Sequence, residues 1–484
     1  MAGSELGAAL VPAMTQQEFA AKLGAFLVRV IPQFRELLAH ERLSGGASQE
    51  TYRLRVATAS GERMIALRRA PGGGTVHEHV IGHPGLRTEA LLMQSARAVG
   101  VPAPEVYGVF EPGDGLGEGF VMEWIEGEAL GARIVRNEEF ARLRPKLAYE
   151  CGQVMARIHA IDLAATGLDA HLDPMTPAEF LDQTWQRYQA LQTPQPMIDY
   201  AARWLHAHLP ATYKKALVHN DFRNGNFMVN AERLVAVLDW EVAHIGDPMR
   251  DLGWICTNSW RFGGGKPVGG FGDYADLFAG YESVSGAKVD PAHVKFWEVF
   301  GSFWWAVGCL GMAEHYRSGP DKTVERPAIG RRTSECQIDC VNLLIPGPVE
   351  LTQAQPFTSV LDMPRSDELL VSVRDFLRGD VMSATAGRTN FLARVAANSL
   401  DIVLRELAVG AAQRHEEQQR LEALLGAAGS ERDLQTLRWQ LVHALRDGSM
   451  PLDAPGLAAH LRTTVVNQVA IDQPVYSGLK KALT

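Results

Sequence analysis

The sequence predicts an α+β protein in which a small, mainly antiparallel sheet precedes a long helical region and an all-helical C-terminal domain. Short apolar or alternating runs, typical of strands, occur before residue 127 and again around residues 216–238. Elsewhere apolar residues recur three and four positions apart, as on one face of a helix. The chain has 484 residues. Because one core rarely extends beyond roughly 250 to 300 residues, we expect more than one domain.

The first elements form a helix and a hairpin. A helix is predicted to begin at Thr15, because Thr15 and Glu18 match a capping box ahead of an apolar stripe. Two strands follow at residues 51–56 and 64–68, joined by a turn near Gly61. The turn before the first strand is unusually rich in small residues.

A second helix and a further strand complete the predicted sheet. Glu89 lies on the helix, which ends before Pro102. Residues 120–125 then form an apolar strand that ends at Gly127. The part of the chain up to residue 127 is therefore predicted to be one small lobe.

The rest of the chain is mainly helical, with one interruption. Residues 147–158 follow the spacing of one helix face. Two apolar strands, Ala216–Val218 and 234–238, each end in a polar cluster. The predicted domains are an N-terminal helix and small lobe (1–127), a helical lobe (128–345), a proline-bearing linker (346–364) and a helical C-terminal domain (365–484).

Composition excludes several classes of function. The chain has 47 basic and 56 acidic residues and a formal net charge of −9, whereas a sequence-independent nucleic-acid binder needs a basic surface. The longest uncharged apolar stretch, residues 299–313, is shorter than the roughly 20 residues of a membrane span and predicts a buried helix. Glu5 stands where a signal peptide would carry basic residues. We therefore expect a cytoplasmic protein without nucleic-acid or membrane partners.

The segment most indicative of chemistry runs from His219 to Asn226, with Asp239 at the end of the next apolar strand. An aspartate, an asparagine five residues later and a second aspartate are the groups that phosphoryl transfer requires. Asp221 would orient an attacking hydroxyl group, and Asn226 and Asp239 would hold magnesium. We expect His219 to brace the loop rather than to act as a base.

With this segment the chain resembles the aminoglycoside phosphotransferase-like small-molecule kinases, over about residues 15–345. The resemblance implies a bilobal, protein-kinase-like domain that uses ATP and Mg²⁺. The segments 260–263, 281–286 and 330–332 are similar to the branch related to kinase domains fused to acyl-CoA dehydrogenases. The C-terminal domain resembles a helical bacterial domain of uncharacterised function that accompanies such kinases.

The resemblance also implies which residues bind the nucleotide. The predicted nucleotide-covering turn consists of Ser44, Gly45, Gly46, Ala47 and Ser48. Arg68 would contact phosphate with Glu89 as its ion-pair partner, and the backbone from Glu123 to Ile125 would meet adenine. Two residues depart from the pattern of the family. Arg68 replaces a lysine, and Asn220 replaces a glycine in a loop where asparagine tolerates positive φ.

The acceptor is less well defined by the sequence. Members of the related branch are linked to phosphorylation of hydroxyacyl-CoA thioesters, so we expect a hydroxyacyl-CoA or a related hydroxy acid. Arg261, Lys266, Arg331 and Arg332 would suit such an anion. Two alternatives stay open, a kinase of another small alcohol or aminoglycoside and a non-catalytic nucleotide-binding scaffold. The sequence also leaves a homo-oligomer open.

Overall fold

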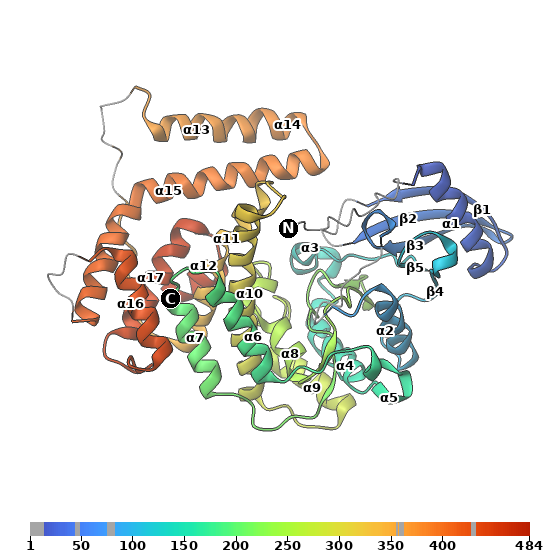
Figure 1. The fold of residues 1–484 in the computed structure, drawn as a ribbon, viewed down its shortest axis with the longest axis horizontal. Helices are drawn as coiled ribbons and strands as arrows, with labels where there is room; N and C mark the ends of the chain where they lie inside the picture. The colour runs from blue at the N-terminus through green and yellow to red at the C-terminus, as the bar shows by residue number, and fades with distance from the viewer. Residues whose placement is uncertain (1–13, 44–48, 75–82, 355–356, 358–362, 427–431) are drawn as a thin grey trace, which may run out of the picture.

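The structure is a computed structural model that describes residues 14–43, 49–74, 83–354, 357, 363–426 and 432–484. A small lobe with a sheet and a larger helical lobe lie side by side, and the C-terminal helices continue from the larger lobe (Figure 1). The chain passes from the small lobe to the helical lobe after strand β5 (Gly119–Glu123). The predicted α+β fold class is confirmed.

The small lobe is a five-stranded antiparallel sheet with the order β1-β2-β3-β5-β4. Its other elements are α1 (Gln16–Val30), β1 (Phe34–Arg42), β2 (Glu50–Thr58), β3 (Gly61–Arg69), α2 (Leu86–Ala98) and β4 (Val106–Val109). The predicted capping box of Thr15 with Glu18 is present, and β2 and β3 form the predicted hairpin. Helix α1 packs apolar side chains such as Leu23 and Phe26 against the sheet.

The sequence pattern does not predict strand β1. Its pairing with β2 shifts register between Phe34 and Glu36 and again between Leu37 and Ala39. Irregular pairing of this kind interrupts the alternation of inward and outward side chains. The apolar residues of β1 therefore do not follow the period of two by which a strand is recognised.

The helical lobe surrounds two short β-ribbons. Its helices are α3 (Gly131–Arg136), α4 (Arg144–His159), α5 (Leu163–Thr166), α6 (Pro177–Ala190), α7 (Pro196–Ala207), α8 (Met249–Cys256), α9 (Tyr274–Ser285), α10 (Pro291–Ser318), α11 (Glu325–Arg331) and α12 (Thr333–Leu344). Strand β6 (Ala216–Val218) pairs with β9 (His244–Gly246), and β7 (Phe227–Val229) pairs with β8 (Leu234–Val237). The two predicted strands thus belong to different ribbons.

The apolar stretch at residues 299–313 lies within α10, as a buried helix. Its buried side chains include Val299, Phe300 and Phe303, which pack among the helices of this lobe. Across the described residues, no helix is both long enough and apolar enough to cross a membrane.

The C-terminal helices share a hydrophobic core with the helical lobe. They are α13 (Ser366–Phe376), η6 (Leu377–Val381), α14 (Met382–Ala384), α15 (Gly387–Leu424), α16 (Leu434–Asp447), α17 (Leu457–Asp472) and α18 (Ser477–Leu483). Helices α16 and α17 pack on α7 and α12, and Arg446 forms a 2.7 Å ion pair with the fully buried Asp199 of α7. One core therefore extends across residue 345.

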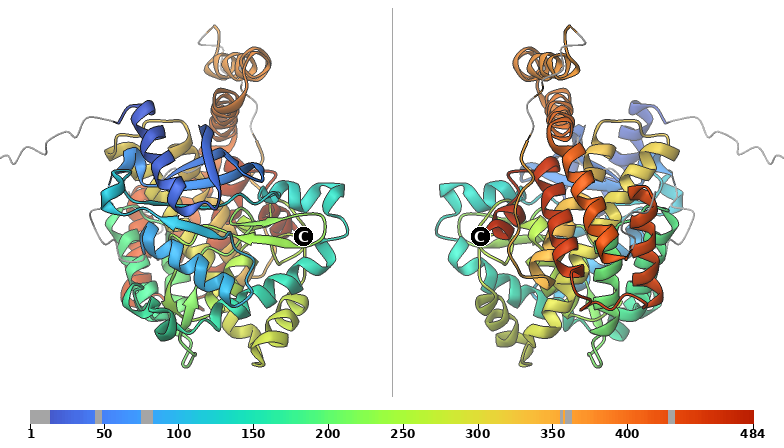
Figure 2. Two further views of the ribbon diagram at one scale, coloured as in Figure 1. Left: turned by 90° about the vertical axis from the view of Figure 1, so that its right-hand side faces the viewer. Right: turned by 90° about the vertical axis from the view of Figure 1, so that its left-hand side faces the viewer.

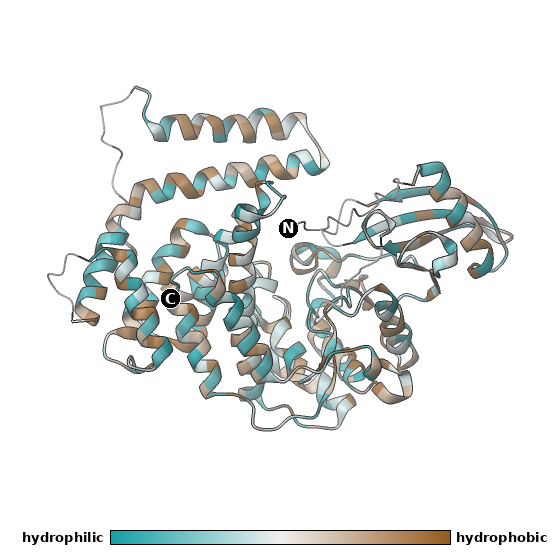
Figure 3. Ribbon diagram, in the orientation of Figure 1, coloured by the Kyte–Doolittle hydropathy of each residue, from teal (hydrophilic) through white to brown (hydrophobic). Residues whose placement is uncertain are grey.

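Residues 366–410, here called the arm, project from this body (Figures 1 and 2). The arm contains α13, η6, α14 and the first part of α15. Helix α13 has no buried residue, and Leu369, Val373 and Phe376 are about half exposed. Hydrophobic residues recur along α13 and along α15 beneath it (Figure 3).

Candidate active site

The loop between β6 and β7 holds Asp221 in a fixed position. The indole Nε1 of Trp254 and the Nε of Arg223 donate hydrogen bonds to Asp221 Oδ1, at 2.7 and 2.9 Å. Asn226 Nδ2 donates to the main-chain oxygen of Asp221 at 3.0 Å and also contacts its Oδ2. The Asp221 side chain remains 19% exposed. The carboxylate is therefore oriented by three neighbours and still accessible.

The β7–β8 ribbon brings Asn226 close to Asp239. Phe227 pairs with Val237, and the N–H of Leu238 donates to the main-chain oxygen of Asn226 at 2.8 Å. Asp239 follows directly with a positive φ of 64°, a conformation that is uncommon for residues other than glycine. The ribbon thus places an amide and a carboxylate at one end.

Arg68 of β3 connects the small lobe to this end of the ribbon. Its Nη2 lies 2.6 Å from Asp239 Oδ1 and 3.6 Å from Glu241 Oε2. Its Nε lies 3.3 Å from Glu89 Oε2 and also donates to Gln49. The contact between Arg68 and Glu89 agrees with the sequence prediction, and the contact with Asp239 adds a link between the lobes.

Burial changes the protonation behaviour of the Arg68 and Glu89 pair. Glu89 is fully buried, and the loss of water raises the pKa of its carboxyl group to about 7, against the opposing effects of Arg68 and Gln49. Burial alone would lower the pKa of Arg68, but Glu89 and Asp239 outweigh it and raise that pKa. Arg68 therefore stays a cation, while Glu89 titrates near neutral pH.

Asp251 of α8 fixes the start of the same loop. Its two carboxylate oxygens accept the main-chain N–H groups of His219 and Asn220, at 2.9 and 2.7 Å, and His159 lies 2.9 Å away. Burial would raise the pKa of Asp251, but these partners lower it overall. Asn220 adopts a φ of 66°, as the sequence predicted for this position.

His219 is buried and braces the loop, as expected from the sequence. Its Nε2 lies 3.0 Å from the main-chain oxygen of Leu238, and its ring packs against Phe222 and Trp240. The ring therefore connects the loop to the end of β8.

A fully buried arginine lies behind the loop. Arg250 Nε donates to Asn220 Oδ1 at 2.9 Å, and its guanidinium carbon lies within 6 Å of five aromatic rings, of which Trp254 is nearest at 4.5 Å. Its Nη1 and Nη2 are buried without a hydrogen-bond partner among the described groups. Burial lowers the pKa of Arg250 to about 9, so the group remains charged at neutral pH.

A cavity of about 530 Å³ lies beside Asn220, between α6, β9 and α10. None of the described residues that line it is an aspartate or glutamate. Arg187 of α6 lines it and donates to Thr184 Oγ1 at 3.3 Å, with no carboxylate in ion-pair distance within the described chain. Phe180 and Trp304, which contact Arg250, also line the cavity. We call it the acceptor-side cavity.

The other residues predicted to bind the nucleotide are the small-residue turn and the backbone from Glu123 to Ile125. Ser44, Gly45, Gly46, Ala47 and Ser48 lie outside the described residues. Glu123 ends β5 and Ile125 follows it, at the junction of the lobes. The N–H of Glu123 already donates to the main-chain oxygen of Glu105 at 2.8 Å.

The four basic residues that would suit a CoA thioester do not gather at the loop. Arg261 pairs with Glu298 at 2.9 Å and Lys266 with Asp273 at 2.6 Å. Arg331 and Arg332 line a separate cavity near the arm. The sequence shows that these residues are basic, but it does not show that Arg261 and Lys266 are already paired with carboxylates.

Sequence reasoning missed several residues around Arg68 and Asp221. Gln49 directly follows the small-residue turn, and Glu241 lies two residues after Asp239, so their positions could have drawn attention to them. Arg250 belongs to the segment 247–251, which resembles a structural motif of the family, but its contact with Asn220, like that of Trp254 with Asp221, depends on how α8 packs against the loop.

Two family models and a solved structure are similar to parts of this chain. A family model described as the phosphotransferase enzyme family matches residues 39–286, and a model described as a domain of unknown function (DUF6285) matches residues 383–476. A crystal structure from Ralstonia eutropha, assigned to the aminoglycoside phosphotransferases, has 23% identity and a TM-score of 0.54, covering 66% of this chain and 95% of that one. This likeness supports the kinase-like fold.

Two curated relatives share part of the chain. Acyl-CoA dehydrogenase family member 10 of Mus musculus is 33% identical over 217 residues, which are 44% of this chain and 19% of that protein. Family member 11 of Gallus gallus is 28% identical over 246 residues, 48% of this chain and 30% of that protein. The chain thus spans less than a third of the length of either relative. The match to the family model covers just over half of the chain, and the chain therefore belongs to the phosphotransferase enzyme family.

Proposed function

We propose that the chain is an ATP- and Mg²⁺-dependent phosphotransferase whose acceptor is the hydroxyl group of a hydroxyacyl-CoA or a related hydroxy acid. The observation that carries the proposal is the convergence of Asp221, Asn226 and Asp239 with Arg68 at the junction of the two lobes. These are the groups that position an acceptor, a metal and a phosphate chain in phosphoryl transfer.

Asn226 and Asp239 suit magnesium. Asn226 uses its Nδ2 to hold Asp221, so its Oδ1 can face a metal. Asp239 binds Arg68 through Oδ1 and its side chain is 32% exposed, so Oδ2 is available as well. Mg²⁺ prefers oxygen ligands and usually keeps several waters, so one amide and one carboxylate are sufficient protein ligands. When bound, the metal would neutralise charge on the nucleotide phosphates.

Asp221 would orient the acceptor and receive its proton. In the transfer, the acceptor oxygen forms a bond to the γ-phosphorus of ATP, and the bond from that phosphorus to the leaving oxygen of ADP breaks. The hydroxyl proton passes to the Asp221 carboxylate. Trp254 and Arg223 hold Asp221 Oδ1 and Asn226 holds Oδ2, so the acceptor would meet the part of this carboxylate that stays exposed. Arg68 would bind phosphate oxygens while Glu89 fixes its side chain.

The charge of the acceptor-side cavity favours an anionic acceptor. A polycationic aminoglycoside needs carboxylates, and none of the described lining residues supplies one. Arg187, which lines the cavity, instead favours a carboxylate or thioester carbonyl, and the buried cation of Arg250 lies behind Phe180 and Trp304 of that lining. The names of the curated relatives, which are acyl-CoA dehydrogenase family members, also support an acyl-CoA acceptor.

A non-catalytic scaffold is the second candidate function, and the same geometry argues against it. A scaffold that only binds nucleotide has no use for Asp221, whose carboxylate is held in position by Trp254 and Arg223. ATP binding without turnover of any acceptor would instead favour the scaffold.

ADP release with Mg-ATP tests the proposal across hydroxyacyl-CoAs, free hydroxy acids, choline-like alcohols and aminoglycosides. We expect turnover with hydroxyacyl-CoA or hydroxy acid and none with aminoglycosides. Arg187→Gln should raise KM for the anionic acceptor with little effect on KM for ATP. Turnover with aminoglycosides alone would overturn the acceptor assignment.

A further inference from the structure

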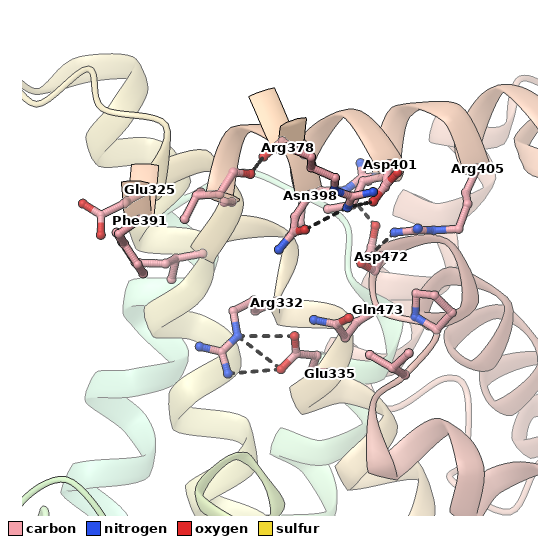
Figure 4. A pocket seen from close by; sticks show the side chains of 18 residues that line it. Glu325, Arg332, Glu335, Arg378, Phe391, Asn398, Asp401, Arg405, Asp472 and Gln473 are labelled. Carbon is pink, nitrogen blue, oxygen red and sulfur yellow. Dashed lines mark hydrogen bonds and ion pairs between the residues drawn. The ribbon is translucent and has the colours of Figure 1, made fainter. Parts of the chain in front are cut away.

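A second cavity, of about 620 Å³, lies between the helical lobe and the arm, outside the site described above (Figure 4). Its floor is formed by α11 and α12, its roof by η6 and α15, and one side by the segment after α17. The volume lies in the range of sites for drug-sized ligands, roughly 300 to 1,000 Å³.

The carboxylates of this cavity are already neutralised. Glu335 lies 3.2 Å from Arg332, and Asp472 lies 2.8 Å from Arg331. Glu325 and Asp401, which also line the cavity, are likewise paired with arginines. A cationic ligand would therefore have to compete with an arginine for each carboxylate.

One arginine of the cavity keeps its charge uncompensated by a direct carboxylate contact. Arg405 donates from Nε to the main-chain oxygen of Ile471 at 2.5 Å and from Nη2 to that of Asp472 at 3.4 Å. Within the described chain no carboxylate lies in ion-pair distance of it. Burial lowers the pKa of Arg405, and the charges of Asp401 and Asp472 offset this effect only in part. An anion placed beside Arg405 would supply the direct ion-pair partner that the guanidinium group lacks among the described residues.

Besides its charged residues and the polar Asn398, Ser399 and Gln473, the cavity has an apolar lining. Ile329, Val395 and Ile402 line it together with Phe391 and Val475. Phe391 is 43% and Val475 86% exposed, so these side chains have apolar surface left to bury. Covering such surface with a hydrocarbon chain is favourable.

We propose that this cavity binds an amphipathic carboxylate, with the anionic group beside Arg405 and the hydrocarbon chain against Phe391. The floor and the roof belong to different parts of the chain, so the ligand holds the arm against the helical lobe. Binding at this site does not depend on the proposed phosphotransfer, because none of the proposed catalytic residues lines the cavity.

Calorimetry of the full chain with sodium decanoate, in the absence of ATP, tests the proposal. We expect saturable binding of one decanoate per chain, and no saturable binding of decylammonium or acetate, which each lack one half of the required chemistry. Hydrogen exchange of the arm should slow when decanoate binds. Absence of saturable decanoate binding, or equal affinity for decylammonium, would overturn the proposal.

Variants locate the binding site. Arg405→Gln and Phe391→Ser should each weaken decanoate binding at least tenfold. The matched control is Arg394→Gln, an exposed arginine of α15 outside the lining, and it should leave affinity unchanged. Phe391 is partly exposed, so Phe391→Ser remains informative if Arg405→Gln fails to fold. Unchanged affinity in folded Phe391→Ser protein, or loss of binding in Arg187→Gln instead, would place decanoate elsewhere and refute the assignment.

Discussion

Replacing Arg68 by lysine tests how the two lobes are joined at the candidate active site. The guanidinium group contacts Gln49 and Glu89 through Nε and Asp239 through Nη2. A lysine ammonium is a single point charge and cannot reproduce this two-sided arrangement. We therefore expect a lysine at position 68 to contact either Asp239 or Glu89, but not both.

The expected loss follows from that geometry. Losing one hydrogen bond between charged groups costs about 1 to 3 kcal/mol, which corresponds to a decrease in kcat/KM of roughly 5- to 150-fold. Arg68→Ala should lose more, because no cation then reaches the phosphates. The assay is ADP release with Mg-ATP and the best acceptor from the panel. Arg63→Lys is a suitable control, because Arg63 lies on the same strand and its side chain donates to the Tyr107 hydroxyl group at 2.8 Å.

A double-mutant cycle with Glu89→Gln identifies the interaction. If the two side chains act as a pair, the effects of Arg68→Lys and Glu89→Gln should be non-additive by about 0.5 to 3 kcal/mol. Additivity within about 0.5 kcal/mol, or a wild-type rate for Arg68→Lys, would mean that Arg68 is not held for catalysis by Glu89.

Three further substitutions probe the remaining parts of the site. Asp221→Asn should lower kcat at least a hundredfold with little change in ATP affinity, whereas Asp239→Asn should weaken magnesium-dependent nucleotide binding in calorimetry; the reverse pattern would exchange their roles. Glu89 has a folded pKa raised to about 7, so its contribution to stability is fully present below about pH 4.5 and is lost as pH rises toward 7. The stability of wild type relative to Glu89→Gln, measured by denaturant unfolding, should therefore fall across that window, and a flat difference would contradict the assignment. Arg250→Met should change KM for an anionic acceptor more than KM for ATP, and equal changes would indicate a purely structural role.

Local sequence signals predicted much of the fold and part of the candidate site. The capping box at Thr15 and the positive φ of Asn220 each depend on neighbouring residues, so the sequence contains the information needed. Arg68 and Asp239 are 171 positions apart, and their contact depends on how the lobes pack. Strand β1 was not predicted, because its irregular pairing with β2 interrupts the alternation of apolar and polar residues.

The charge of the acceptor-side cavity could not be predicted from composition either. Acidic and basic side chains are nearly balanced over residues 252–345, but among the described lining residues of the cavity only Trp304 comes from this range, and none is a carboxylate. Burial and pairing decide which charges a ligand meets. Glu298, for example, lies within residues 252–345, but it already forms an ion pair with Arg261 and accepts a hydrogen bond from Tyr274.

The core that spans residue 345 has a consequence for how such catalytic lobes are attached to other domains. Leu205 of α7 and Val341 of α12 are fully buried in a core that includes Leu441 of α16 and Val466 of α17. A chain shortened after residue 345 would expose this surface to water and should aggregate. A homologous lobe that joins a different domain needs polar residues at these positions or another apolar partner. The character of α7 and α12 in a relative's sequence should therefore reveal which kind of neighbour its catalytic lobe evolved to contact.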